Sequence, residues 1–177
     1  MTDEPSVADL LVEYDRAIAH TDSLWRDLTE DEVRWRPVER SSAIGWHVGH
    51  QAAVAHFLVR NLTAAEPLID PELDALMDSA TDEPDRGELP DLERLGAYRN
   101  AVAERVHVRM GDIDAGRVGA PTQLRVIATG LLVAVVNHEY QHATWIGEVR
   151  SEQLGKPLPS VPESELLTTL DGYPVIA

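Results

Sequence analysis

Residues 122–149, TQLRVIATGLLVAVVNHEYQHATWIGEV, decide the fold of this chain. Apolar side chains recur there every three or four residues, which predicts one long helix with a buried stripe. His138 and His142 lie on that stripe four residues apart, so both imidazoles face the same side of the helix. A buried imidazole needs a hydrogen-bond partner or a metal ion. One ion would satisfy both rings, so the pair predicts a metal site.

A second helix, over about residues 44–62, is expected to supply a third nitrogen. His50 is the preferred ligand, and His47 is its rival one turn earlier. Spacing alone does not separate them, because positions three apart differ by only ~60° around a helix. Val54 and Phe57 are in register with His50 and place it on the core stripe of this helix. His47 is then either a residue lining the site or a structural one.

The rest of the chain also reads as helical. Periodicity predicts two further helices, over about residues 6–28 and 92–110, and Gly111 is expected to end the second of these. The long helix that contains His138 and His142 is expected to end before Gly155. Thr29 to Glu32 has the form of a capping box and starts a short turn that Trp35-Arg36-Pro37 stops. Residues 63–90 form a long connection between helices two and three, with one short helix near 72–77.

These segments predict an all-α fold, a four-helix bundle, with no strand. We expect residues 1–155 to form the bundle and the proline-rich residues 156–177 to form a tail packed on it. At 177 residues the chain suits one domain.

Composition excludes several classes of function. There is no cysteine, so any thiol chemistry must use a thiol from outside the chain. A net charge of −16 repels phosphate backbones and anionic membranes, which argues against nucleic-acid partners. No apolar run approaches the ~18 residues of a membrane span, and the first residues lack the pattern of a leader. We therefore expect a soluble, cytoplasmic protein.

A competing motif is present, because His138-Glu139-x-x-His142 matches the H-E-x-x-H of zinc proteases, with the glutamate as general base. That interpretation needs a third ligand downstream, for which only Glu163 or Glu165 in the tail would serve. It also leaves His50 unexplained, and the chain lacks a sheet-bearing lobe to hold a peptide. The bundle metal site is preferred.

Three stretches carry a resemblance to a known family: GWHVGH at 45–50, NHEYQH at 137–142, and LTEDE before WRP within 28–37. Over about residues 6–155 the chain resembles the DinB-like superfamily. That superfamily includes DinB/YfiT proteins, mycothiol and bacillithiol S-transferases, and the N-terminal domain of ergothioneine sulfoxide synthases. Its members bind a divalent metal through one histidine of helix two and an H-x-x-x-H pair. The resemblance therefore implies His50, His138 and His142 as metal ligands.

The resemblance also implies a function. It points to a thiol S-transferase or isomerase with zinc, nickel or iron, zinc being the first expectation, and a small-molecule substrate, in a homodimer. Lys156 is the only lysine beside fourteen arginines, a bias of GC-rich bacterial genomes that favours mycothiol as the thiol. Arg60 and Arg99 are candidates for holding a carboxylate. The alternatives are an iron-dependent oxidative enzyme and a non-catalytic metal-binding stress-response protein.

Overall fold

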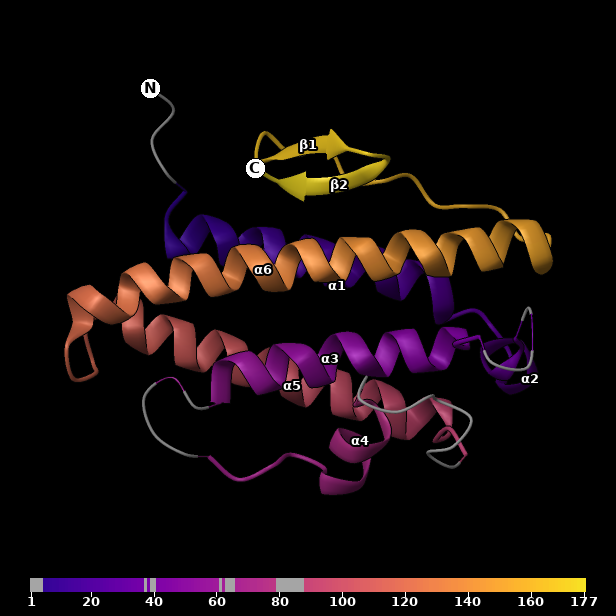
Figure 1. Cartoon of the computed structure of the whole chain (residues 1–177), viewed down its shortest axis with the longest axis horizontal. Coiled ribbons are helices and arrows are strands. Elements are labelled where there is room, and N and C mark those ends of the chain that lie inside the picture. The colour runs from indigo at the N-terminus through magenta and orange to yellow at the C-terminus, as the bar shows by residue number, and fades with distance from the viewer. Residues whose placement is uncertain (1–4, 37, 39–40, 61, 63–65, 79–87) are drawn as a thin grey trace.

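Four long helices lie side by side along the molecule in the computed structural model (Figure 1), which describes all residues except 1–4, 37, 39–40, 61, 63–65 and 79–87. They are α1 (Val7–Trp25), α3 (Ile44–Arg60), α5 (Leu92–Asp114) and α6 (Pro121–Glu148). Helix α6 packs against α1 and α3, and α3 also packs against α5. The connections hold the short helices α2 (Glu30–Arg34) and α4 (Pro71–Leu76). The predicted all-α fold class is confirmed.

The start of α2 follows a capping signal of the sequence. Thr29 forms the predicted capping box with Glu32, and α2 stops at Arg34. The predicted end of the third long helix at Gly111 is wrong, because α5 continues to Asp114. The apolar period extends past the glycine to a fully buried Ile113, which keeps the helix packed on the core.

The C-terminal tail contains two strands that the sequence analysis did not predict. Strands β1 (Leu167–Leu170) and β2 (Tyr173–Ile176) pair antiparallel around the turn residues Asp171 and Gly172. Both turn residues have positive φ, 51° and 91°, as a two-residue hairpin turn requires. The missed signal was this Asp-Gly dipeptide between two short β-prone runs. The hairpin lies against α6 (Figure 1), where Asn137 Nδ2 donates to the carbonyl of Ile176 at 3.0 Å.

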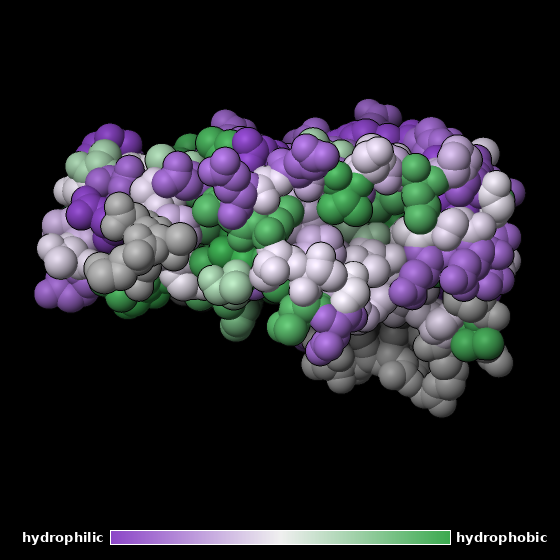
Figure 2. Space-filling model, turned by 90° about the horizontal axis from the view of Figure 1, so that it is seen from above, coloured by the Kyte–Doolittle hydropathy of each residue, from purple (hydrophilic) through white to green (hydrophobic). Residues whose placement is uncertain are grey.

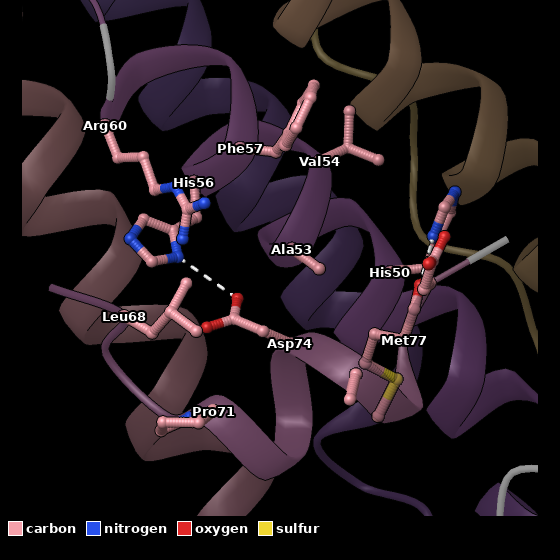
Figure 3. A pocket seen from close by; sticks show the side chains of 12 residues that line it. His50, Ala53, Val54, His56, Phe57, Arg60, Leu68, Pro71, Asp74 and Met77 are labelled. Atoms are coloured by element: carbon pink, nitrogen blue, oxygen red, sulfur yellow. Dashed lines mark hydrogen bonds and ion pairs between the residues drawn. The ribbon is translucent and has the colours of Figure 1, made fainter. Parts of the chain in front are cut away.

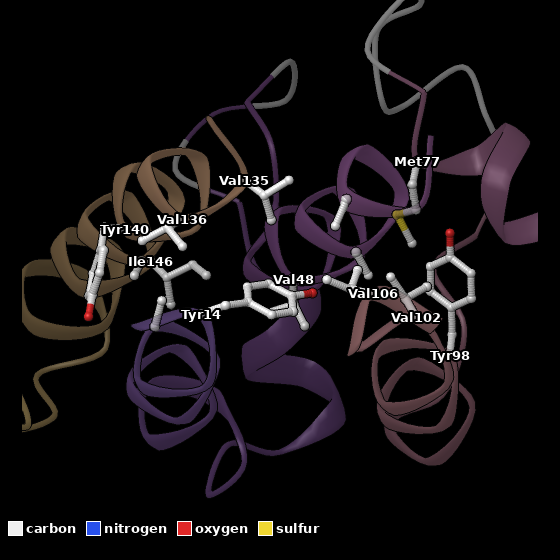
Figure 4. Close-up of a cluster of buried hydrophobic side chains, with 14 of the residues drawn as sticks. Tyr14, Val48, Met77, Tyr98, Val102, Val106, Val135, Val136, Tyr140 and Ile146 are labelled. Carbon is white, nitrogen blue, oxygen red and sulfur yellow. The ribbon is translucent and has the colours of Figure 1, made fainter. Parts of the chain in front are cut away.

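The core is a layer of apolar side chains contributed by all four long helices (Figure 4), including Tyr14, Val48, Val106 and Val136. Each of these is at most 2% exposed. Seen from above, hydrophobic side chains also reach the surface in several groups among hydrophilic ones (Figure 2). In the part of the chain that the structure describes, no helix has the length and apolar character needed to cross a membrane.

A buried ion pair crosses this core. The guanidinium of Arg99 on α5 contacts the carboxylate of Glu139 on α6, and both side chains are almost fully buried. Arg99 Nε also donates to Asp22 on α1 at 3.0 Å. Gln51 on α3 completes the set, because its Nε2 donates to the backbone carbonyl of Glu139 at 2.8 Å. Burial lowers the pKa of Arg99, but Glu139 and Asp22 more than offset this and raise it. The four long helices are thus joined through one charged cluster.

We predict that Glu139→Gln lowers the free energy of unfolding by about 3 kcal/mol, because it removes the closest counter-charge from a buried guanidinium. The double variant Arg99→Met/Glu139→Leu should recover most of that loss, since it leaves no buried charge of the pair behind. Urea denaturation measures both. Glu72→Gln, in the exposed pair with Arg94, is the control and should stay within about 0.5 kcal/mol of the parent. A loss in Glu139→Gln no larger than in this control would contradict the prediction.

Candidate metal centre

The structure brings together the three predicted ligands from two helices. One ring nitrogen each of His50 on α3 and of His138 and His142 on α6 lie within 4.8 Å of one another. The ring centroids of His138 and His142 are 4.3 Å apart, and that of His50 is 5.2 and 5.0 Å from them. The helix register that places them follows from the hydrogen bond of Gln51 to the carbonyl of Glu139.

Two of the three rings are oriented by a hydrogen bond on the side away from the cluster. His50 Nδ1 lies 2.7 Å from the backbone carbonyl of Met77, just after α4. A carbonyl only accepts, so Nδ1 of His50 carries the proton and Nε2 keeps its lone pair for the cluster. His142 Nδ1 lies 2.8 Å from Nδ1 of His47, and the tautomer in which His142 donates this bond leaves Nε2 of His142 for the cluster. Such outer contacts are typical of histidines that bind metals.

Sequence reasoning did not find the Met77 carbonyl, since any residue offers a backbone oxygen. Gly49 is an indirect sign of this contact in the sequence, because a Cβ added at this position would lie 2.5 Å from Sδ of Met77. A glycine at this position lets the segment after α4 approach α3 closely. The rival ligand His47 lies beside His142 and outside the group of three. Trp46 stacks on the His50 ring, with centroids 4.4 Å apart and planes 10° apart.

The imidazoles of His138, His142 and His47 are neutral near pH 7. Burial, with a smaller contribution from neighbouring histidines, lowers the pKa of His138 to about 4 and that of His142 to about 2. The same causes lower the pKa of His47 to about 4. A neutral imidazole offers its lone pair without first losing a proton, as a metal ligand must. Three such nitrogens are a donor set that fits zinc, nickel or iron(II).

Glu139 does not suit the role of a general base in an H-E-x-x-H site. Its side chain is 2% exposed and is paired with Arg99 in the core. Glu163 and Glu165, the candidates named above for the third ligand of such a site, are exposed in the tail and are not in the histidine group. The match to H-E-x-x-H therefore arises because Glu139, a member of the buried ion pair, lies in the sequence between two histidines of the candidate metal site.

Two pockets adjoin the histidines. One, of about 500 Å³, is lined by His50 together with residues of α3 and α4 (Figure 3). The other, of about 380 Å³, lies between α6 and the hairpin and is lined by His138, Gln141 and Tyr173, among others. Phe57 is 66% exposed and lines the first pocket. The sequence argument that placed His50 on a core stripe through Phe57 was therefore wrong, since that stripe is a pocket wall.

We predict that the metal-free protein loses stability as the pH falls from about 6.5 to about 4. In this window the histidines of the unfolded chain take up protons, whereas His138, His142 and His47 of the folded chain stay neutral. The variant His142→Gln should reduce the proton uptake on unfolding by about one. Urea unfolding of metal-free protein across the window measures the slope. An unchanged slope in His142→Gln would contradict the assignment.

A comparison with protein families agrees with this arrangement. The model of the DinB superfamily matches residues 13–146, which include the histidines of both α3 and α6. A search of curated proteins gives no match to the chain. The family match covers more than half of the 177 residues, and the fold and the three histidines are those that the resemblance in the sequence implied. The chain therefore belongs to the DinB superfamily.

Proposed function

We propose that this protein is a metal-dependent enzyme that transfers a low-molecular-weight thiol to an electrophilic small molecule. The observation that carries the proposal is the group formed by His50, His138 and His142, three imidazoles from two packed helices. Zinc is the ion that we expect first, and nickel or iron(II) is compatible with the same donors.

A divalent ion held by neutral imidazoles lowers the pKa of a thiol or water bound to it. The residues of the chain hold and orient the donors: the Met77 carbonyl fixes the ring of His50, and His47 fixes that of His142. The thiol comes from outside, because the chain has no cysteine. Its proton passes to solvent, its sulfur bonds to the electrophilic carbon, and the electron pair of the broken bond stays with the leaving group.

The two pockets support a reaction with two substrates, since one adjoins His50 and the other adjoins His138. The pocket at His138 is lined by the polar side chains of Gln141, Asp171 and Tyr173. Amide, carboxylate and phenol groups are suited to the hydroxyl groups of a sugar. This supports mycothiol, a thiol that carries sugar rings, as the cosubstrate, in line with the bias toward arginine in the sequence.

Two other functions use the same histidines. An iron-dependent oxidative enzyme would bind iron(II) through them and consume oxygen. A non-catalytic metal-binding protein would hold the ion without turnover. The two pockets favour an enzyme over the non-catalytic protein, because a protein that only holds an ion needs no substrate-sized space beside it.

We predict one zinc or other divalent ion per chain after purification without chelators, and turnover of a thiol with an electrophile such as a chlorinated nitrobenzene. His142→Ala should lose at least about tenfold in metal affinity, since two imidazoles remain. His107→Ala is the matched control, because this exposed histidine pairs with Asp15 outside the group of three. Metal analysis and a panel of mycothiol, bacillithiol and glutathione measure both effects.

The outcomes separate the three functions. Stoichiometric metal with thiol transfer that is lost in His142→Ala supports the proposal. Metal without turnover of any thiol supports the non-catalytic protein, and iron with oxygen consumption supports the oxidative enzyme. Equal metal content in His142→Ala and in the parent would overturn all three, because each needs this histidine as a ligand.

A further inference from the structure

The pocket beside His50 contains polar atoms that the metal site does not use. Arg60 Nε and Asp74 Oδ2 are both buried, and neither has a hydrogen-bond partner. Both residues line the pocket, which is about 500 Å³ in volume (Figure 3). A buried polar atom without a partner is unfavourable, and such atoms mark places where a ligand or water completes the bonding.

A chain of hydrogen bonds orients the Asp74 carboxylate and uses only one of its two oxygens. Arg105 Nη1 lies 2.9 Å from Nε2 of His56, and arginine only donates, so Nε2 accepts and the proton of His56 is on Nδ1. His56 Nδ1 then donates to Asp74 Oδ1 at 3.1 Å. The Tyr98 hydroxyl donates to the same oxygen at 2.7 Å. Oδ2 is left as a carboxylate acceptor.

The donor without a partner lines the same pocket as this acceptor. Arg60 follows His56 by four residues on α3, so the two side chains share one face of the helix. Figure 3 shows the Arg60 side chain running beside the His56 ring, and a dashed line joins that ring to Asp74. The guanidinium and the carboxylate therefore line one pocket with opposite charges.

These charges select the ligand. A simple anion would pair with Arg60 but would meet the carboxylates of Asp74 and Asp78, which also lines the pocket. A simple cation would pair with Asp74 but would meet the guanidinium of Arg60. A group that carries an ammonium and a carboxylate satisfies both at once, without adding net charge to an acidic protein.

The remaining wall is apolar and leads toward the metal site. Val54 and Phe57 line it from α3, and Leu68 lines it from the connection before α4. Arg60 is ten residues from His50, or about 15 Å along the helix. A ligand held at Arg60 and Asp74 would lie with its apolar part along this wall, directed toward His50.

We propose that this pocket binds an apolar α-amino acid, with its carboxylate on Arg60 and its ammonium on Asp74. Binding of the amino acid does not depend on the proposed function. The site is built from α3 and α4 and uses none of the three histidine imidazoles as a contact for the charged groups.

Calorimetric titration of metal-free protein with L-leucine tests the binding. L-leucine should bind, and both its methyl ester, which lacks the carboxylate, and N-acetyl-leucine, which lacks the ammonium, should bind at least about tenfold more weakly. Arg60→Gln should weaken the binding of leucine by a similar factor but leave the affinity for the methyl ester unchanged. Asp74→Asn should weaken the binding of leucine but leave the affinity for N-acetyl-leucine unchanged. Arg125→Gln on the exposed face of α6 is the control and should bind leucine as the parent does.

If the titration shows no heat of binding up to the solubility limit of leucine, the proposal is overturned. This is the result expected if the pocket holds only water. Equal affinity for leucine and both analogues would also overturn it, as would an equal loss in Arg60→Gln and Arg125→Gln. The failure of the metal function is distinguishable, because leucine would still bind metal-free protein while no thiol transfer is found.

Discussion

The buried pair between Arg99 and Glu139 is the constraint on which the rest of the structure depends. A guanidinium taken out of water needs counter-charges and acceptors, and these are provided by Asp22, Gln51 and Glu139 from three other helices. An apolar interface tolerates small slips between helices, whereas a buried charge does not. The pair thus fixes the register of α1, α3, α5 and α6.

The same register assembles the histidines. His50 directly precedes Gln51 on α3, and His138 directly precedes Glu139 on α6. Consecutive helical residues are about 100° apart around the axis, so one of each pair faces the charged cluster and the other faces the neighbouring helix at the metal centre. The contact between Gln51 and the carbonyl of Glu139 therefore also sets the distance between His50 and the α6 histidines.

Periodicity and spacing were enough to predict the long helices and the pair of His138 and His142, because both depend on local repeats of side chains. The choice of His50 over His47 rested on the resemblance to the family, since spacing did not separate the two. Contacts between distant segments were beyond this reasoning, and the Met77 carbonyl behind His50 is an example. The Asp171-Gly172 turn was readable in the sequence and was overlooked. Phe57 shows the opposite error, since an apolar residue in register with His50 lines a pocket and not the core. Burial of a helix face depends on which neighbours cover it, and the sequence does not state that.

The proposed function depends on one ion held by three histidines from two helices. Anomalous diffraction from a crystal of the zinc-loaded protein tests this most directly. We expect one zinc site with Nε2 atoms of His50, His138 and His142 at about 2.0–2.1 Å. Zinc bound through His47 in place of His50, or through a carboxylate of the tail, would contradict the account.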